Sequence, residues 1–257
     1  MNQDLLFKAI LLFLVAFVGY MHSYCGSTMH NRPLIIGSLV GAVLGDIKTG
    51  VIIGGLLELV FLGAVPIGAS NPPDMTSGTV IATAFTILFG ATKGVAIIIA
   101  MPIAALIALF DNFQMMSLLT KVAHKCDEAA KCGDERKIEK IAVVASVGNK
   151  VVLALLVAII FYFSSPLVEI FINWIPKWIS HAIDLVASIV PVLGIASLTR
   201  MVISKDNWGY LGLGFLLSAY LNISTLLVAL IGVIIVVILF HKESNKKTEV
   251  EIDDNEF

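Results

Sequence analysis

One carboxylate, Glu58, lies in the otherwise apolar run from Val51 to Leu62. If this run lies within a membrane, an ionised side chain there costs about 3 kcal/mol unless it faces a partner or a water-filled cavity. We interpret Glu58 as a functional group, either an acceptor for the hydroxyl groups of a solute or a proton carrier. The alternative is a structural carboxylate that is paired with Lys48, with Lys93 or with a helix N-terminus.

Two consecutive prolines interrupt the apolar sequence a few turns further on, in the Ser-Asn-Pro-Pro-Asp segment at positions 70–74. Proline removes a backbone donor and restricts the residue before it, so a helix cannot continue through this segment. Transporters bind substrates at such breaks, beside water-filled cavities. Asn71 offers a donor and an acceptor, and Asp74 offers an acceptor. We therefore expect Glu58, Asn71 and Asp74 to bind substrate; the alternative is a tight surface loop in which Asp74 only caps a helix.

The histidines and cysteines give no comparable signal. His22, Cys25 and His30 surround the end of the first apolar segment, but their spacing fits no standard zinc pattern. Cys126 and Cys132 lie in a highly charged segment that suits a reducing cytoplasm. The sequence contains no Gly-rich phosphate loop or nucleotide fingerprint. It therefore predicts no catalytic residue, no metal, no cofactor and no disulfide.

The composition is that of a membrane protein. Of the 257 residues, 58% are hydrophobic and only 14% are charged, and the mean hydropathy is +0.94. A soluble fold could not bury this much apolar surface, so lipid must cover part of it. A net charge of −2 provides no electrostatic basis for binding nucleic acid. These values exclude an ordinary soluble enzyme and indicate membrane lipid as the surroundings of the chain.

Several apolar stretches are long enough to enter the bilayer, since a spanning helix needs about 20 residues. They are residues 5–24, 33–69, 78–110, 141–163, 183–203 and 211–240. The second stretch contains charged residues and many glycines, and the last is long enough for one span and a re-entrant piece. The sequence therefore predicts an all-α polytopic membrane protein with broken or re-entrant helices.

The more polar segments between these stretches predict the topology. Lys121–Lys140 is a long hydrophilic loop, and its lysines place it in the cytoplasm by the positive-inside rule. The mixed segment 166–181, with Trp174 and Trp178, is predicted to be an interfacial amphipathic helix. Residues 241–257 form a charged tail that we expect to be disordered.

Glycines recur every four residues at Gly37, Gly41 and Gly45, and again at Gly50 and Gly54. This spacing places them along one face of a helix, where neighbouring backbones can approach closely. The face indicates a tightly packed transport core, or simply close packing of two helices.

The run from residue 30 to residue 74 resembles the N-terminal signature of subunit IIC in the mannose–fructose–sorbose family of sugar phosphotransferase systems (PTS). The elements that carry the resemblance are Arg32-Pro33-Leu34, the Gly-Asp-Ile-Lys-Thr-Gly turn at Gly45–Gly50, Gly54-Gly55 followed by Glu58, and Ile67-Gly68-Ala69 with Pro73-Asp74. The resemblance continues more loosely to Phe240, and segment 176–198 is similar to the N-acetylgalactosamine branch.

The resemblance implies that residues 1–240 form a PTS EIIC domain in the bacterial inner (cell) membrane, which moves a hexose or amino sugar. It implies a IID membrane subunit, a trimer of IIC–IID pairs, and cytoplasmic IIA and IIB phosphocarriers. The sugar would be of the mannose, fructose, sorbose, glucosamine or N-acetylgalactosamine type. Because the partners carry the phosphorylated histidines, no phosphoacceptor is expected here, and the resemblance leaves open whether the chain counts as an enzyme. The sugar site of the family is expected around Glu58, Asn71 and Asp74.

The residues alone also permit two other functions. One is a proton- or sodium-coupled secondary transporter, with Glu58 and Asp74 as the ion-sensitive groups. The other is a membrane scaffold that transports nothing. A PTS subunit delivers a phosphorylated sugar and needs phosphoenolpyruvate, whereas a coupled transporter delivers free substrate and responds to ionophores.

Overall fold

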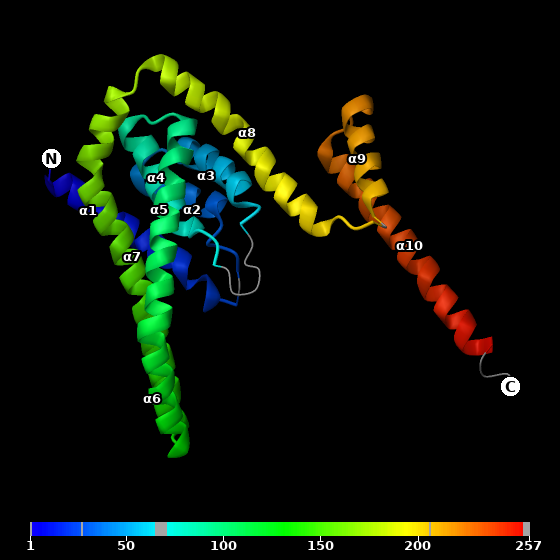
Figure 1. Cartoon of the computed structure of the whole chain (residues 1–257), viewed down its shortest axis with the longest axis horizontal. Helices are drawn as coiled ribbons and strands as arrows, with labels where there is room; N and C mark the ends of the chain where they lie inside the picture. Colours follow the sequence, from blue (N-terminus) through cyan, green and yellow to red (C-terminus); the bar gives the residue numbers. More distant parts are fainter. Residues whose placement is uncertain (1, 27, 65–70, 206, 254–257) are drawn as a thin grey trace. The chain divides into compact units, whose positions relative to one another are not determined.

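The computed structural model describes residues 2–26, 28–64, 71–205 and 207–253, and the regular structure in these ranges is helical (Figure 1). The α-helices are α1 (Asn2–Tyr20), α2 (Pro33–Leu44), α3 (Ile47–Phe61), α4 (Met75–Phe89), α5 (Lys93–Gln114), α6 (Thr120–Lys131), α7 (Glu135–Trp174), α8 (Lys177–Val202), α9 (Trp208–Leu221) and α10 (Thr225–Asp253). The chain divides into two compact units, Met1–Thr199 and Arg200–Phe257. The all-α prediction is therefore confirmed.

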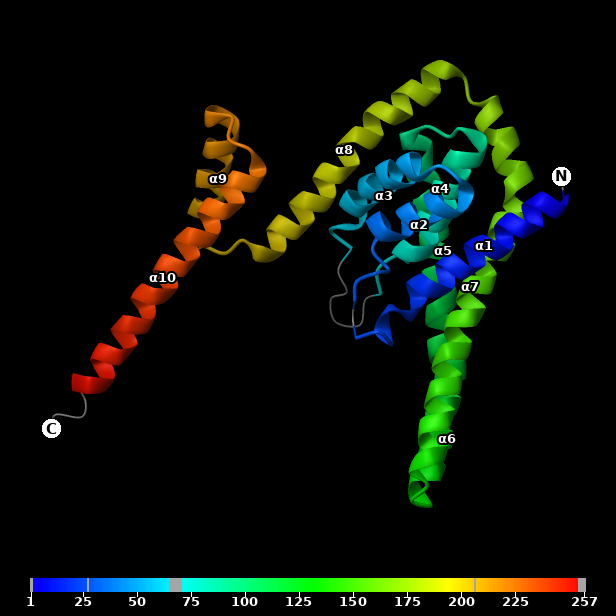
Figure 2. The same cartoon turned by 180° about the vertical axis from the view of Figure 1, so that it is seen from behind.

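Helix α4 is the centre of the first unit. Every residue from Thr76 to Thr86 is buried, and the helix packs against α1, α2, α3, α5 and α7. Figure 2 shows it from behind, enclosed by its neighbours. Phe85 of α4 stacks on Phe161 of α7, with ring centres 5.6 Å apart. A helix that is apolar on all sides must lie inside the protein, and its burial fixes the position of its N-terminus at Asp74.

Helices α2 and α3 form a short antiparallel hairpin. With 12 and 15 residues, neither reaches the length that a single bilayer crossing needs. Gly45 ends α2 with a φ of +88°, which glycine adopts without strain, and the Asp46 carboxylate caps α3 by accepting the Thr49 N–H at 3.0 Å. A Cβ added to Gly37 would lie 2.7 Å from the Cα of Gly54. Gly37, Gly41, Gly50 and Gly54 therefore serve close packing of the two helices, whereas Gly45, which was predicted on the same face, lies in the turn and outside the contact.

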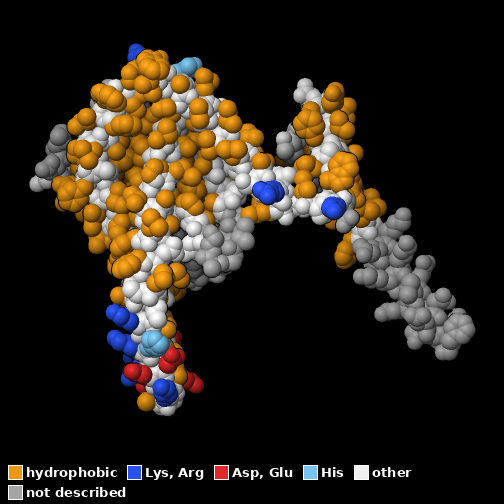
Figure 3. All heavy atoms as spheres, in the orientation of Figure 1, with side chains coloured by type: hydrophobic (Ala, Val, Ile, Leu, Met, Phe, Trp, Pro, Cys, Tyr) orange, Lys and Arg blue, Asp and Glu red, His pale blue; other side chains and the backbone are white. Residues whose placement is uncertain are grey.

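The hydrophilic segment Lys121–Lys140 is a helical hairpin, so the prediction of a loop is wrong. A π-helical turn, Met115–Leu119, connects α5 to α6, and Gly133 makes the tight turn to α7 with a φ of +69°. The segment is rich in Lys, Glu and Ala, which favour helix even in water. Figure 3 shows its charged side chains gathered along the hairpin, whereas the rest of this face of the first unit is mainly hydrophobic.

The prediction of a separate interfacial helix over 166–181 is also wrong. Helix α7 continues through Pro166 to Trp174, and α8 starts at Lys177. Membrane helices tolerate an internal proline because hydroxyl groups supplement the backbone bonds, and Ser165 donates to the carbonyl of Phe161 at 2.5 Å. Segment 166–181 therefore consists of the end of one helix and the start of the next.

Within the described residues, four helical stretches are long and apolar enough to cross a membrane: Gln3–Tyr20, Lys93–Lys131, Glu135–Ile172 and Lys177–Val202. Shorter apolar helices include α2, α4, α9 and the part of α10 from Thr225 to His241. This arrangement agrees with a multi-pass protein that contains broken helices. Helix α10 extends into the charged tail as far as Asp253, and the disorder expected for residues 241–257 stays a prediction.

Candidate functional site

Glu58 lies near the end of α3 and binds the start of α2. Its Oε1 accepts a hydrogen bond from Nε of Arg32 at 2.5 Å and also pairs with Nη2, while Oε2 accepts the backbone N–H of Leu34 at 3.2 Å. The carboxylate is thus paired as the structural alternative supposed: it binds a helix N-terminus, the first turn of α2, whereas its cation is Arg32 and not Lys48 or Lys93. The side chains of Arg32 and Glu58 are 32% and 20% exposed. The pair is therefore partly open and keeps free lone pairs for a ligand.

Asp74 lies where the chain resumes a helix after the double proline. Its Oδ2 accepts the backbone N–H of Ser77 at 2.8 Å, which makes it the N-cap of α4, and the hydroxyl of Tyr20 at 2.6 Å. Its own backbone N–H donates to the carbonyl of Ala104 in α5 at 3.0 Å. The capping role predicted for Asp74 is present, and Tyr20 adds a side-chain contact from α1. Two helices, α1 and α4, therefore bind the carboxylate, and α5 holds the backbone of the same residue.

Asn71 contacts a different part of α5. Its side-chain amide donates to the amide oxygen of Asn112. Residues 71–74 thus run along α5 from Asn112 to Ala104 and carry two polar side chains past an otherwise apolar helix. Ser70 and the five residues before it, which connect this segment to α3, lie outside the described residues.

A further polar cluster lies between α1, α5 and α7. The Lys150 ammonium lies 5.9 Å from the centre of the Tyr20 ring, and the Asn149 amide donates to Asp111 at 3.2 Å. The side-chain oxygens of Asn149 and Gln114 are buried and have no partner among the described residues. Polar groups are rare in spanning helices and usually face a bundle interior or a water-filled path. The surroundings of Asp74 are therefore more polar than its neighbours in sequence suggest.

The structure groups the three predicted residues into two clusters. Glu58 belongs to the Arg32 cluster at the α2–α3 hairpin, whereas Asp74 and Asn71 belong to the segment along α5. Within the ranges that the structure describes, no hydrogen bond or ion pair connects Glu58 with either of the others. Arg32 and Tyr20 are the partners that sequence reasoning missed. The Arg-Pro pair at a helix start was the available signal for Arg32, whereas nothing in the sequence marked Tyr20.

The histidines near this site have structural contacts. His30 bonds through Nε2 to the carbonyl of Val18 at 2.7 Å, and His22 bonds through Nδ1 to the carbonyl of Gly19 at 3.3 Å. The described residues include no group of three His, Cys, Asp or Glu side chains that could hold a metal ion. The arrangement of carboxylates, amides and a guanidinium can therefore bind hydroxyl groups, but it contains no activated nucleophile.

Comparison with known proteins matches nearly the whole chain. The family model of the PTS system sorbose-specific IIC component matches residues 6–238. The sorbose-specific EIIC component of Klebsiella pneumoniae is 31% identical over 233 residues, which are 90% of this chain and 87% of that protein. The mannose-specific EIIC component of Escherichia coli strain K12 is 30% identical with the same coverage. The fructose permease IIC component of Bacillus subtilis strain 168 is 32% identical over 217 residues, 83% of this chain and 79% of that protein.

Two solved structures have a similar fold. A structure described only as a membrane protein has a TM-score of 0.83. The mannose transporter ManYZ, in its complex with microcin E492, has a TM-score of 0.57. Each is 29% identical and covers 91% of this chain and 95% of the matched chain.

Proposed function

The chain belongs to the family of PTS sorbose-specific IIC components and is a multi-pass sugar-transport subunit of the cell membrane, and from this premise we propose that Glu58, Asn71 and Asp74 bind its sugar. The relatives are PTS permease components, so an ion-coupled transporter is not favoured. One observation carries the proposal. Two carboxylates within the apolar body lie at ends of short helices, and protein donors hold each in place.

The chemistry of these side chains suits a neutral polyol. A sugar hydroxyl donates to a carboxylate in the same way as the Tyr20 hydroxyl donates to Asp74. Replacing the Tyr20 hydroxyl by a sugar hydroxyl exchanges one hydrogen bond from a neutral donor for another and leaves the charges of the site unchanged. The guanidinium of Arg32 orients Glu58, and the free lone pairs of the carboxylate accept from sugar. Asn71 adds a donor that can reach a sugar oxygen.

The mechanism we propose places no bond-making step in this chain. The sugar binds between the hairpin and the segment at residues 71–74, and the site opens alternately to the two sides of the membrane. We propose that a IID subunit completes the pathway, in a trimer of IIC–IID pairs. Cytoplasmic IIA and IIB proteins then phosphorylate the sugar, which makes its release irreversible. The relatives are named for sorbose, mannose, fructose and N-acetylgalactosamine, so we propose a hexose or amino sugar, with glucosamine also possible by chemistry.

We also propose a division of the chain at residue 240. Residues 1–240 form the membrane domain, and residues 241–257 form a charged tail outside it. The family match to residues 6–238 supports this boundary.

The test is reconstitution of the chain with a IID, IIA and IIB set from the same family, followed by uptake of labelled sugars. We expect one sugar to accumulate as its phosphate only when phosphoenolpyruvate is present. Glu58→Gln and Asp74→Asn should each abolish this uptake, whereas Asp127→Asn, in the exposed α6, should not. Uptake of free sugar that a proton ionophore abolishes would contradict the PTS assignment. Normal uptake by both site variants would contradict the site alone.

A further inference from the structure

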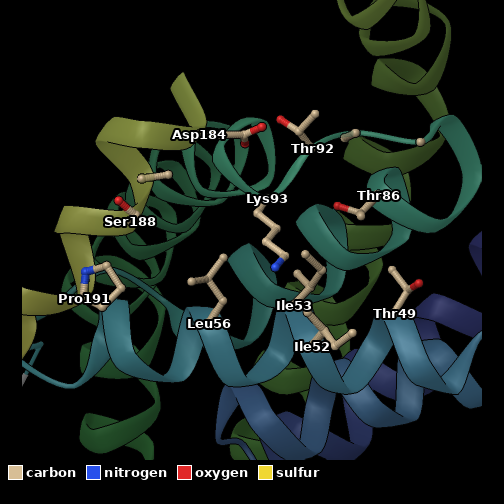
Figure 4. Close-up of a pocket in the computed structure, with 13 residues that line it drawn as sticks. Thr49, Ile52, Ile53, Leu56, Thr86, Thr92, Lys93, Asp184, Ser188 and Pro191 are labelled. Atoms are coloured by element: carbon tan, nitrogen blue, oxygen red, sulfur yellow. The ribbon is translucent and has the colours of Figure 1, made fainter. Parts of the chain in front are cut away.

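A cavity of about 850 Å³ lies between α3, α4, α5 and α8 in the first unit (Figure 4). None of the proposed sugar-binding residues lines it. The lining residue nearest to Glu58 in α3 is Leu56, two positions earlier, which places the two side chains about 200° apart around the helix and therefore on opposite faces. The cavity is therefore separate from the proposed sugar site.

Helix α8 packs closely on the rest of its unit at several points, and two of these contacts, at Gly94 and Gly63, lie on either side of the cavity. A Cβ added to Gly94 of α5 would lie 2.8 Å from the backbone of Ile183. A Cβ added to Gly63, just after α3, would lie 2.8 Å from Cβ of Ser197. The space between these two close contacts is bounded at both ends, so it is a defined site.

Two opposite charges line the cavity. Figure 4 shows the Lys93 side chain directed into the hollow, toward Ile53 of α3. Lys93 forms no ion pair or hydrogen bond with any residue that the structure describes. The Asp184 carboxylate accepts the backbone N–H of Gly94 through Oδ1 at 2.7 Å, and its Oδ2 has no partner in the described ranges. Lys93 is exposed and Asp184 is partly buried, and neither has a partner of opposite charge in the described ranges, so the two groups suit a ligand with complementary charges.

The remaining walls are mainly apolar, and the cavity begins at the level of the lipid headgroups. Ile52, Ile53 and Leu56 line it from α3, and Pro191 lines it from α8. Lys93 is the first residue of α5, and Trp178, in the first turn of α8, is 73% exposed. Exposed indole rings and lysines favour the headgroup region. The cavity therefore extends from charged groups near the membrane surface toward apolar groups at greater depth.

We propose that this cavity binds a phospholipid whose headgroup carries both a phosphate and a primary ammonium group, as in phosphatidylethanolamine. Lys93 binds the phosphate, Oδ2 of Asp184 accepts from the ammonium, and an acyl chain lies along Leu56 and Pro191. An anionic lipid without an amine would leave Asp184 unpaired beside a second negative charge. A hexose has the wrong shape, because it offers no apolar chain for the walls and is much smaller than the cavity.

The test uses the full chain in nanodiscs that contain equal amounts of phosphatidylethanolamine, phosphatidylglycerol and phosphatidylcholine. Native mass spectrometry of the released protein identifies the retained lipid. We expect phosphatidylethanolamine to be enriched and Lys93→Gln and Asp184→Asn each to reduce its retention about tenfold, which corresponds to ~1.4 kcal/mol. Lys177→Gln, at the start of α8 but outside the cavity lining, should retain it as the unaltered chain does.

The lipids themselves provide a control that needs no variant. Phosphatidylcholine has the same phosphate and charge, but its methylated amine has no N–H to donate to Asp184, so it should be retained less. Equal retention of phosphatidylglycerol, or unchanged retention after Lys93→Gln, would overturn the proposal. Displacement of the lipid by a hexose would instead assign the cavity to sugar and overturn it as well.

Discussion

The hydrogen bond between Tyr20 and Asp74 allows a quantitative prediction. The hydroxyl donates to a carboxylate at 2.6 Å, and the Tyr20 residue is only 5% exposed. Hydrogen bonds to charged groups contribute ~1.5–3 kcal/mol. Tyr20→Phe removes this donor while the Ser77 N–H still binds the same carboxylate oxygen. We therefore expect a loss of about 2 kcal/mol in the free energy of unfolding, near the middle of that range.

The assay is unfolding of the detergent-solubilised chain by increasing fractions of sodium dodecyl sulfate. Tyr162→Phe is the matched control, because the Tyr162 hydroxyl makes no hydrogen bond among the described residues. A double-mutant cycle with Asp74→Asn should give a coupling of about 1–2 kcal/mol. If Tyr20→Phe and Tyr162→Phe unfold alike and the cycle shows no coupling, the assignment of Tyr20 as a holder of Asp74 is refuted.

Three further predictions concern the α2–α3 hairpin. Arg32→Met should cost about 1–3 kcal/mol, because it leaves the partly exposed Glu58 without its cation and with only the Leu34 N–H as a donor. Adding Glu58→Leu should restore stability in the same unfolding assay while uptake stays absent. Gly50→Ala should cost about 1–3 kcal/mol, since its Cβ would lie 2.7 Å from the Cα of Gly41. Gly55→Ala, whose Cβ would lie 3.7 Å from the nearest atom, should be nearly neutral. Equal unfolding midpoints for the two variants would contradict this packing. Hydrogen bonds from the hydroxyl and N–H of Thr49 lower the pKa of Asp46. The contribution of Asp46 to stability should therefore be present above its unfolded-state pKa and be lost as pH falls through its folded-state pKa. In acid, the unfolding midpoint of Asp46→Asn should vary less with pH than that of the unaltered chain.

The fold could be predicted well where one physical constraint dominates. Hydrophobic length alone identified most membrane helices, because a bilayer demands about 20 apolar residues and leaves few other solutions. The glycine spacing predicted close helix packing, which α2 and α3 show, because a residue without a side chain lets two helix backbones approach closely. The polar segment Lys121–Lys140 was wrongly predicted because hydropathy measures affinity for lipid and carries no information on helix formation in water. Lys, Glu and Ala propensities were the signal that favoured a helical hairpin there.

The candidate site could be predicted only in part. Its carboxylates stand out in the sequence because a charge in an apolar run costs free energy, whereas no such signal marks the residues that bind them. A carboxylate in an apolar run is conspicuous, whereas a tyrosine at the end of a spanning helix is ordinary. Tyr20 and Asp74 are 54 positions apart, and only the packing of α1 on α4 brings them together. The Glu58 partner was sought at Lys48, at Lys93 or at a helix N-terminus; the start of α2 is such a terminus, but the cation is Arg32, which precedes α2.

The different donors of the two carboxylates make them unequal in transport. Exchanging the Tyr20 hydroxyl for a sugar hydroxyl at Asp74 replaces one neutral donor by another, so the free energies nearly cancel. Displacing Arg32 from Glu58 would instead separate two opposite charges, which costs about 1–3 kcal/mol at this partly exposed position. A neutral sugar provides no charge to compensate that loss. In the site that we propose, the sugar therefore adds to the Arg32–Glu58 pair without breaking it, while at Asp74 it replaces Tyr20.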